Sequence, residues 1–265
     1  MQLGDQRVLL TGASGGIGLA IARALHARGA VVIATARREE VLNELKAELG
    51  ERLETLVSDL AESSDVAALP QRAGRVDVLV ANAALPASGV LVEFSPEEID
   101  RALDVNLRAP LQLARALVPA MTERGSGHLV FISSLSGKAA SPGSSLYSAT
   151  KFGLRGMALG LSEDLAETPV GVTTVFPGFI RDAGMFADSG TELPSYVGTR
   201  TPEDVADAVV KSIERGFLEV DVAPLSMRVG AKFAGMAPAL SARLQRRLGS
   251  TELSAQMAKG QASKR

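Results

Sequence analysis

Tyr147 and Lys151, four residues apart, are the side chains in this 265-residue sequence best suited to acid–base chemistry. They follow a Pro-Gly-Ser-Ser turn, and apolar residues continue at helical spacing after them, so both side chains are predicted to share one helix face. A phenol titrates near pH ~10, and an ammonium one helical turn away stabilises the phenolate and lowers that pKa. The pair is therefore a candidate general acid/base.

A serine hydroxyl precedes this pair at a suitable distance along the chain. Ser134 lies thirteen positions before Tyr147, at the end of the apolar run 129–132, and its hydroxyl is suited to bind the same substrate oxygen. A Tyr/Lys pair at this spacing also arises often by chance, and a purely structural role is then the alternative. The elements around the pair must decide between the two interpretations.

Composition limits the classes of protein and of site. Hydrophobic residues make up 46% and charged residues 22%, which is typical of one large globular α/β domain. Cysteine is absent and only two histidines occur, so no metal site is expected. The net charge of −2 argues against nucleic-acid binding. No apolar run of about 18 residues and no signal segment is recognisable, which predicts a cytoplasmic protein.

Apolar strands alternate with helical patterns along residues 1–222. Strands are predicted at 7–11, 30–35, 53–58, 76–81, 128–133, 170–176 and 218–222. Helices are predicted from the glycine-rich loop to residue 29, at 39–49, 62–73, 96–123 and 202–215, and around Tyr147. Continuously apolar strands indicate a parallel sheet that is covered on both faces. We therefore expect a doubly wound, Rossmann-like domain with seven parallel strands.

Ligands of such a sheet lie outside the carboxyl ends of the strands. Gly12, Gly16 and Gly18 follow the first strand, where glycines let the backbone approach a pyrophosphate at a helix N-terminus. Their G-x-x-x-G-x-G spacing differs from the G-x-G-x-x-G of the standard fingerprint. A tight turn between strand and helix is the alternative interpretation.

Polar residues follow the next three strands as well. Arg37, with Arg38 beside it, suits the 2′-phosphate of NADP, and the alternative is a solvated helix start with NAD as cofactor. Asp59 is placed to accept the adenine amino group or to cap the next helix. Asn82 either bridges backbone groups or forms a turn.

Together these motifs resemble the short-chain dehydrogenase/reductase family over roughly residues 6–222. The glycine-rich loop TGxxxGxG matches residues 11–18, the Tyr-x-x-x-Lys motif matches Tyr147 and Lys151, and the helix asparagine matches Asn106. The family serine falls on Ser134, because the thirteen-residue interval favours it over Ser133.

The resemblance implies an NADP(H)-dependent oxidoreductase that interconverts a secondary alcohol and a ketone, or reduces an aldehyde, with NAD as the alternative cofactor. Tyr147 would be the acid/base, Ser134 would orient the substrate oxygen, and Lys151 would lower the phenol pKa and bind the nicotinamide ribose. Asn106 would hold the water of a proton relay. The implied cofactor contacts are Gly12, Ser14, Gly16, Ile17, Gly18, Arg37, Arg38, Asp59, Leu60, Asn82, Ala83, Tyr147, Lys151, Pro177, Gly178 and Ile180.

Three positions depart from the family pattern. Ala84 places a β-carbon where the family has glycine, and Asp182 replaces a threonine that commonly helps bind the carboxamide. Gly15 stands where many NADP-dependent members carry a basic residue, so the NADP prediction depends on Arg37.

The loop after Pro177-Gly178 is predicted to form an apolar substrate lid, with Phe179, Met185 and Phe186 beside Ser134 and Tyr147; Leu193 and Tyr196 belong to the same loop. A mainly apolar small molecule that carries a carbonyl or alcohol is the expected substrate. The rival hypothesis is a non-catalytic NAD(P)-binding sensor or scaffold.

A homodimer or homotetramer is expected through the helix that carries Tyr147 and the helix before it. Small residues on that helix would permit close approach of two subunits; they are Ala149, Gly153, Gly156 and Gly160.

Residues 223–265 are predicted to form a basic C-terminal extension. Residues 222–265 hold eight Lys and Arg and one acid, a net charge of +7, whereas the preceding 221 residues carry twenty Lys and Arg and twenty-nine acids, a net charge of −9. A basic amphipathic helix from Pro238 would carry Leu240, Leu244 and Leu248 on one face. Docking near the lid is the favoured fate, with peripheral contact to an anionic membrane and a flexible tail as alternatives. The last ten residues are predicted to be disordered.

Overall fold

One seven-stranded parallel sheet organises the described part of the chain. The computed structural model describes all residues except 192, 194–196, 248–249 and 262–265. The strand order is β3-β2-β1-β4-β5-β6-β7, and every pair is parallel. The strands are β1 Arg7–Thr11, β2 Val31–Ala36, β3 Leu53–Val57, β4 Val78–Ala81, β5 Gly127–Ile132, β6 Val170–Pro177 and β7 Glu219–Val222. The predicted doubly wound fold is confirmed, with strand ends shifted by one or two residues.

The apolar strands have no solvent-facing side. Val8, Leu9 and Leu10 of β1 are all completely buried, although consecutive side chains of a strand point to opposite faces. Leu9 packs into one hydrophobic core, and Val8 and Leu10 pack into the other. Continuous apolar runs are therefore required here, because each strand must supply side chains to two cores.

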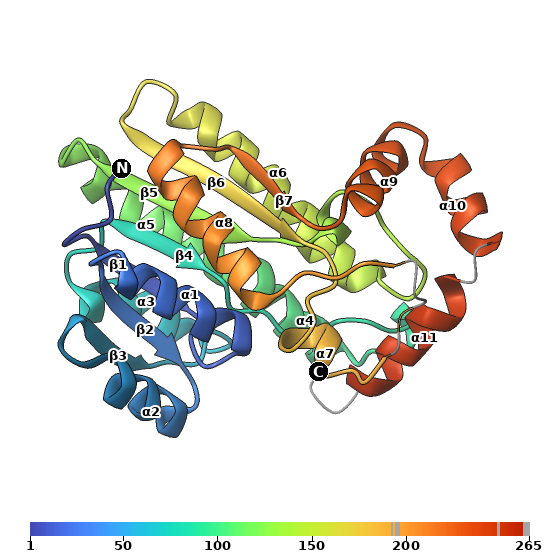
Figure 1. The fold of residues 1–265 in the computed structure, drawn as a ribbon, viewed down its shortest axis with the longest axis horizontal. Coiled ribbons are helices and arrows are strands. Elements are labelled where there is room, and N and C mark those ends of the chain that lie inside the picture. Colours follow the sequence, from blue (N-terminus) through green and yellow to red (C-terminus); the bar gives the residue numbers. More distant parts are fainter. Residues whose placement is uncertain (192, 194–196, 248–249, 262–265) are drawn as a thin grey trace.

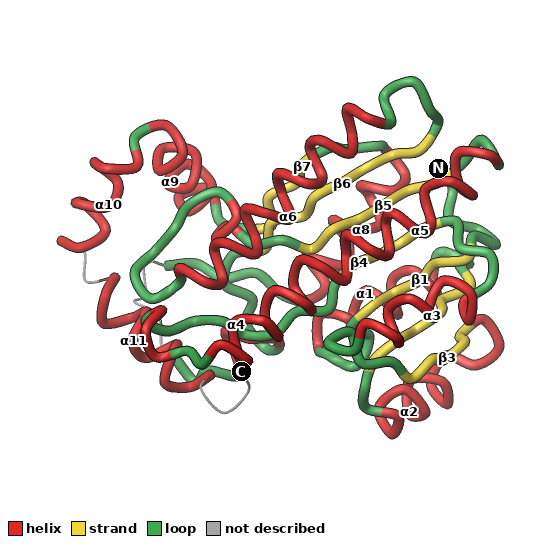
Figure 2. Tube along the Cα trace, turned by 180° about the vertical axis from the view of Figure 1, so that it is seen from behind, coloured by secondary structure: helices red, strands yellow, loops and turns green. Residues whose placement is uncertain are grey.

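Helices cover both faces of the sheet. α1 (Gly16–Ala27), α2 (Glu39–Leu49) and α8 (Pro202–Arg215) contribute to one core, and α3 (Ser63–Ala73), α5 (Ala109–Glu123) and α6 (Ser145–Asp164) contribute to the other. α1 and α8 lie in front of the sheet in Figure 1, and α5 and α6 lie in front in Figure 2. The remaining helices are α4 Pro96–Leu103, α7 Gly184–Ala187, α9 Leu225–Met236, α10 Pro238–Arg247 and α11 Ser250–Gln261, with 3₁₀ turns at Gly50–Arg52, Leu91–Glu93 and Leu135–Gly137.

Local sequence signals account for several helix ends. Thr201 and Asp204 form a reciprocal capping box at the start of α8, with Pro202 as the first helical residue. Gly216 ends the same helix in the left-handed conformation, at φ 71°. A π-helical turn at Asp104–Arg108 joins α4 to α5 within the helical region predicted at 96–123. Asn106 lies in that turn, and such irregular turns often occur at functional sites.

The C-terminal extension is helical, so the prediction of disorder over the last ten residues is wrong as far as Gln261. α9 and α10 stand at one end of the molecule, and α11 returns toward α4 and α7 (Figures 1 and 2). Gln261 is 2% exposed, and its Nε2 donates a hydrogen bond to the Met185 carbonyl at 2.9 Å. It is therefore α11 that docks near the lid. The basic helix α10 leaves Leu240 and Leu244 exposed, and Leu248 lies outside the described residues.

A buried histidine in β5 makes the fold sensitive to acid. His128 is 4% exposed with its Nε2 2.8 Å from Thr173 Oγ1, and burial lowers its pKa to about 4. The unfolded chain takes up a proton below pH ~6.5, whereas the native state does so only near pH 4. Stability is therefore present above pH ~6.5 and falls as the pH drops toward 4, by about 3 kcal/mol.

We expect His128→Gln to remove this part of the pH dependence in urea unfolding at neutral and acid pH. His26→Gln is the matched control, because His26 is only half-buried in α1. The prediction would be contradicted if the free energy of unfolding of the His128 variant fell between neutral and acid pH by as much as that of the wild type.

Candidate active site

The site is built around the point where the strand order reverses. β1 pairs with β2 on one side and with β4 on the other, so the loops after β1 and β4 meet at this carboxyl edge. Asn82 Nδ2 donates to the carbonyls of Thr11 and Gly12 at 3.1 and 3.2 Å. Thr11 Oγ1 accepts from the backbone N–H groups of Asn82 and Ala83 at 3.0 and 3.1 Å. Asn82 is thus a bridge between the two loops.

Glycines are required where these loops touch. Gly12 has φ +67°, and a β-carbon on it would lie 2.7 Å from Ala83 Cα. A β-carbon on Gly18 would lie 2.2 Å from the Gly12 carbonyl oxygen. This packing leaves the start of α1 at the carboxyl edge, preceded by Gly15 with no side-chain cap. The unpaired N–H groups of a helix start attract anions such as a pyrophosphate.

Two arginines lie beside the glycine-rich loop. Arg38 Nη2 donates to the Ser14 carbonyl at 2.5 Å, and its Nε and Nη2 both lie 3.3 Å from Ser14 Oγ. The Arg37 side chain is 51% exposed and lies 3.8 Å from Asp59 Oδ2. Arg37 was predicted to have the main role, but it is Arg38 that contacts the loop.

Asp59 does not cap α3. Its Oδ1 accepts from the Ala61 N–H at 3.0 Å within the loop, and Glu62 precedes the first helical residue. Its other oxygen faces Arg37, and the neighbouring Leu60 is buried. Arg37 and Asp59 thus line the same edge of the sheet beyond β2 and β3.

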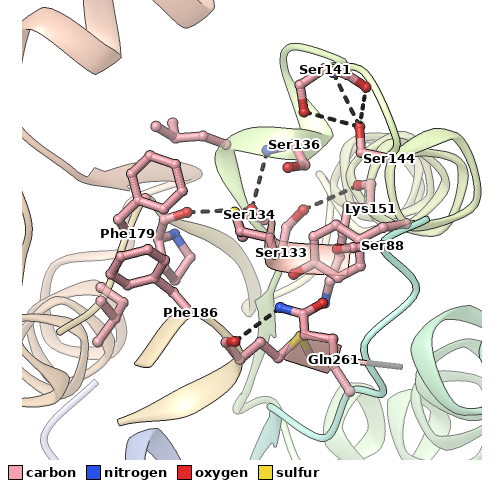
Figure 3. Close-up of a pocket in the computed structure, with 18 of the residues that line it drawn as sticks. Ser88, Ser133, Ser134, Ser136, Ser141, Ser144, Lys151, Phe179, Phe186 and Gln261 are labelled. Atoms are coloured by element: carbon pink, nitrogen blue, oxygen red, sulfur yellow. Dashed lines mark hydrogen bonds between the residues drawn. The ribbon is translucent and has the colours of Figure 1, made fainter. Parts of the chain in front are cut away.

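The candidate acid/base pair lies on α6, next to the loop after β5. Lys151 is 2% exposed, and its Nζ donates to the Ile132 carbonyl at 3.0 Å and lies 5.6 Å from the centre of the Tyr147 ring. Ser134 Oγ accepts from the Ser136 N–H at 3.1 Å and lies 3.5 Å from the Pro177 carbonyl oxygen. Ser133 instead donates to the Lys151 backbone carbonyl at 3.1 Å and is 4% exposed. The two adjacent serines therefore have different partners (Figure 3).

Burial shifts the pKa values of both Tyr147 and Lys151, and the pKa of the tyrosine is raised where a lowered value was expected. Burial raises the pKa of Tyr147 to about 12, and the nearby Ser134 side chain only partly opposes this rise. Burial also lowers the pKa of Lys151 to about 8. Desolvation of the phenolate dominates the net shift, and the lowering of the phenol pKa by Lys151 stays a prediction. A phenol that keeps its proton at neutral pH is suited to donate it.

Asn106 is held by the loop after β4. Its Oδ1 accepts from the Leu85 N–H at 2.7 Å and its Nδ2 donates to the Leu85 carbonyl at 3.0 Å, with the residue 1% exposed. The side-chain amide therefore fastens the π-helical turn to this loop. Its role in a proton relay stays a prediction.

A cavity of about 300 Å³ lies over these residues. The predicted substrate residues all line it: Ser134, Tyr147, Phe179, Met185 and Phe186. The rings of Phe179 and Phe186 lie 4.9 Å apart and form an apolar wall (Figure 3). Several predicted cofactor residues line it as well, namely Ile17, Asn82, Lys151, Pro177, Gly178 and Ile180.

Two further residues, Leu193 and Tyr196, were predicted to belong to the lid loop. Leu193 is half-buried and does not line the cavity, and Tyr196 lies outside the described residues. The lid also rests on the glycine-rich loop, because a β-carbon on Gly16 would lie 2.2 Å from Ala183 Cβ.

Helix α11 supplies a cavity wall that was not predicted from the sequence. Leu253, Ser254, Met257 and Gln261 all line the cavity. Their spacing places them on one side of a helix, which is the signal that could have identified them. Gln261 Oε1 is buried and has no hydrogen-bond partner among the residues that the structure describes.

Neither a metal centre nor a membrane span is found in the residues that the structure describes. No group of three or more His, Cys, Asp or Glu side chains there is placed to hold a metal ion. No described helix combines the length and apolarity needed to cross a bilayer.

Comparisons with known proteins point to one family. Residues 6–193 match the family model described as short chain dehydrogenase. The ketoacyl reductase HetN of Nostoc sp. is 39% identical over 228 residues, which span 83% of this chain and 79% of that protein.

Two solved structures share the fold and hold a nucleotide. The closed form of serine dehydrogenase complexed with NADP+ has a TM-score of 0.75 at 32% identity, covering 83% of this chain and 96% of that one. A short-chain dehydrogenase from Sphingobium yanoikuyae in complex with NADPH has a TM-score of 0.77 at 30% identity, covering 89% and 95%.

Proposed function

The chain belongs to the short-chain dehydrogenase/reductase family, and on this basis we propose that it is an NADP(H)-dependent enzyme that interconverts a secondary alcohol and a ketone, or reduces an aldehyde. The observation that carries the proposal is that the hydroxyl of Ser134 and the phenol of Tyr147 line one apolar cavity, with Lys151 Nζ 5.6 Å from the centre of the Tyr147 ring. A hydroxyl and a phenol that converge in this way can bind one substrate oxygen together.

The residues present fit a phosphorylated dinucleotide. Gly12 and Gly18 let the loop pack closely against the start of α1, whose N–H groups have no side-chain cap and can bind a pyrophosphate. Arg38 and Arg37 lie at the end of β2, where a 2′-phosphate is recognised in this fold. The NADP(H)-bound neighbours support the same cofactor, and NAD is the alternative.

When bound, the nicotinamide would supply or accept the hydride. Tyr147 then donates its phenolic proton to the carbonyl oxygen during reduction, and takes a proton from the alcohol in the reverse direction. Ser134 hydrogen-bonds the same oxygen and holds it in place. Lys151 brings a positive charge close to the phenol, which stabilises the phenolate left after proton transfer.

The cavity favours a mainly apolar substrate. Its walls include the two adjacent phenylalanines, Met185, and Leu253 and Met257 of α11. The ketoacyl reductase relative supports a carbonyl compound with an alkyl chain as one substrate class to test.

Oxidation of NADPH, followed at its absorbance, in a panel of ketones, aldehydes and oxoacyl thioesters tests the proposal. We expect turnover with at least one apolar carbonyl compound. Tight NADPH binding without turnover across the whole panel would instead favour the non-catalytic sensor or scaffold.

Reversing the charge beside the glycine-rich loop is expected to change the cofactor preference. Arg38→Asp and Arg37→Asp should each lower the ratio of NADP to NAD efficiency by about tenfold or more, because a carboxylate repels the 2′-phosphate. Arg38 should have the larger effect, since it contacts Ser14. Arg52→Asp is the control, because Arg52 is exposed before the amino end of β3. Equal efficiencies of the wild-type protein with both cofactors would contradict the assignment.

We also propose a homodimer or homotetramer that forms through α6 and α5. Phe152 and Leu159 on α6 and Leu111 on α5 are 42%, 36% and 42% exposed. Ala149, Gly156 and Gly160 are exposed on α6, but Gly153 is not part of such a face, because a β-carbon on it would lie 3.0 Å from Leu107 of the same chain.

Gly156→Glu tests this interface, because the position is open and the new side chain fits within one subunit. We expect light scattering to show a multiple of the 27.6 kDa chain mass for the wild type and a smaller mass for the variant. A wild-type mass of one chain at micromolar concentration would contradict the proposal. Cytoplasmic location stays a prediction.

A further inference from the structure

The two helices α9 and α10 carry positive charge without any acid. Residues 225–247 contain Arg228, Lys232, Arg243, Arg246 and Arg247 and no Asp or Glu. All five basic residues are exposed. The helices stand at one end of the molecule, beyond the ends of β6 and β7 (Figures 1 and 2). The end of the protein is therefore strongly positive, whereas residues 1–221 are net negative.

The same two helices turn apolar side chains to solvent. Met236 is 87% exposed, and the other exposed side chains are Leu225 at 71%, Val229 at 58%, Leu240 at 57%, Leu244 at 49% and Phe233 at 37%. We call these six residues and the five basic ones the α9–α10 surface. Residues 225, 229, 233 and 236 recur at helical spacing and so share one side of α9. Ala231 and Ala234 occupy the buried side of that helix.

Basic residues lie on the same side as the apolar ones. Arg228 and Lys232 come three positions after Leu225 and Val229, which places them next to the apolar stripe of α9. Arg243 and Arg247 stand in the same relation to Leu240 and Leu244 of α10. Arg228 lies 3.8 Å from Asp221, so part of its charge is offset by the body.

We propose that the α9–α10 surface binds peripherally to an anionic lipid bilayer. Apolar side chains mixed with Lys and Arg are typical of helices that lie in a membrane interface. The apolar side chains of such a helix enter the boundary of the acyl region, and its cations contact the lipid headgroups. A second copy of the same surface would bring five basic residues against five others with no acid in residues 225–247 to pair with them, and such like charges repel. The net negative body is repelled by the same bilayer, so contact is confined to this end of the molecule.

The binding surface and the cavity share one helix. Met227 of α9 lines the cavity, while Leu225 and Val229 on either side of it in sequence are exposed. A bilayer-bound molecule would thus hold its cavity close to the lipid surface. This consequence rests on the proposed function, whereas lipid binding itself does not.

Sedimentation of the full chain with vesicles tests the proposal directly. We expect it to pellet with phosphatidylcholine vesicles that contain one third phosphatidylserine, to remain in solution with phosphatidylcholine alone, and to bind less at physiological than at low salt. Arg243→Gln with Arg247→Gln should weaken binding by roughly thirtyfold, because each basic residue contributes about fivefold near such a surface. Val229→Ser with Met236→Ser should also weaken it.

Lys211→Gln with Arg215→Gln is the matched control, since it removes two exposed charges from α8 and should leave binding unchanged. The thermal midpoint of each variant shows that it folds. No pelleting of the wild type, or equal loss in the control, would overturn the proposal. A lower solution mass of the Val229/Met236 variant, without lipid binding by the wild type, would assign the surface to a second copy of the chain.

Discussion

Tyr147→Phe is expected to lower kcat by about a thousandfold while leaving NADPH affinity nearly unchanged. The substitution keeps the half-buried ring in its place on α6 and removes only the phenolic hydroxyl that faces the cavity. The transferable proton is lost, but the contacts of the glycine-rich loop and of Arg38 are untouched. Steady-state reduction of the best carbonyl substrate, with NADPH binding followed by fluorescence, gives both quantities.

Two further substitutions make this result specific. Ser134→Ala should lower kcat as well, because it removes the second group on the substrate oxygen. Ser145→Ala, at the exposed start of the same helix, should have no effect on either quantity. A kcat of the Tyr147→Phe variant within tenfold of the wild-type kcat would rule out the phenol as the acid/base.

Lys151→Ala is expected to damage both turnover and cofactor affinity. The ammonium provides the positive charge near the phenol, and the family resemblance assigns it a second contact with the nicotinamide ribose. We expect kcat to fall by about a hundredfold or more and the Kd for NADPH to rise. A lower thermal midpoint with unchanged kinetics would show that Lys151 is only a structural residue beneath Ile132.

The pH dependence of reduction gives an independent readout of the same lysine. With its pKa lowered to about 8, Lys151 is charged below that pH and neutral above it, while Tyr147 keeps its proton to about pH 12. kcat/KM for reduction should therefore be level near neutrality and fall above about pH 8. Lys151→Arg stays charged throughout, so its remaining activity should lack this fall. A wild-type profile that is level into the strongly alkaline range would contradict the assignment.

The fold was predictable because its signals are local and repeated. A strand buried on both faces must be continuously apolar, and glycine is the residue that the contacts at Gly12 and Gly18 allow. The ends of strands were less predictable. β5 begins at Gly127 because that residue pairs with Val170 across the sheet, a long-range contact that no local pattern contains.

The site was predictable where position along the chain determines position in the fold. Residues at or just beyond the carboxyl ends of parallel strands must meet at one edge, which is how Asn82, Ser134 and Pro177 come to share a cavity. The roles of Arg37 and Arg38 could not be separated in this way, since neighbouring side chains leave the backbone in different directions. The pKa of Tyr147 also depends on burial by distant segments, which spacing does not report.

The wall formed by α11 has a consequence for protein synthesis. The proposed nucleotide site is built entirely from residues that leave the ribosome by the time β7 has emerged, whereas the cavity is not closed until Gln261 follows about 40 residues later. At ~5–20 residues per second, this is a delay of a few seconds. During that interval the nascent domain can already bind NADPH, which stabilises the folded sheet by mass action, before it has a complete place for a substrate.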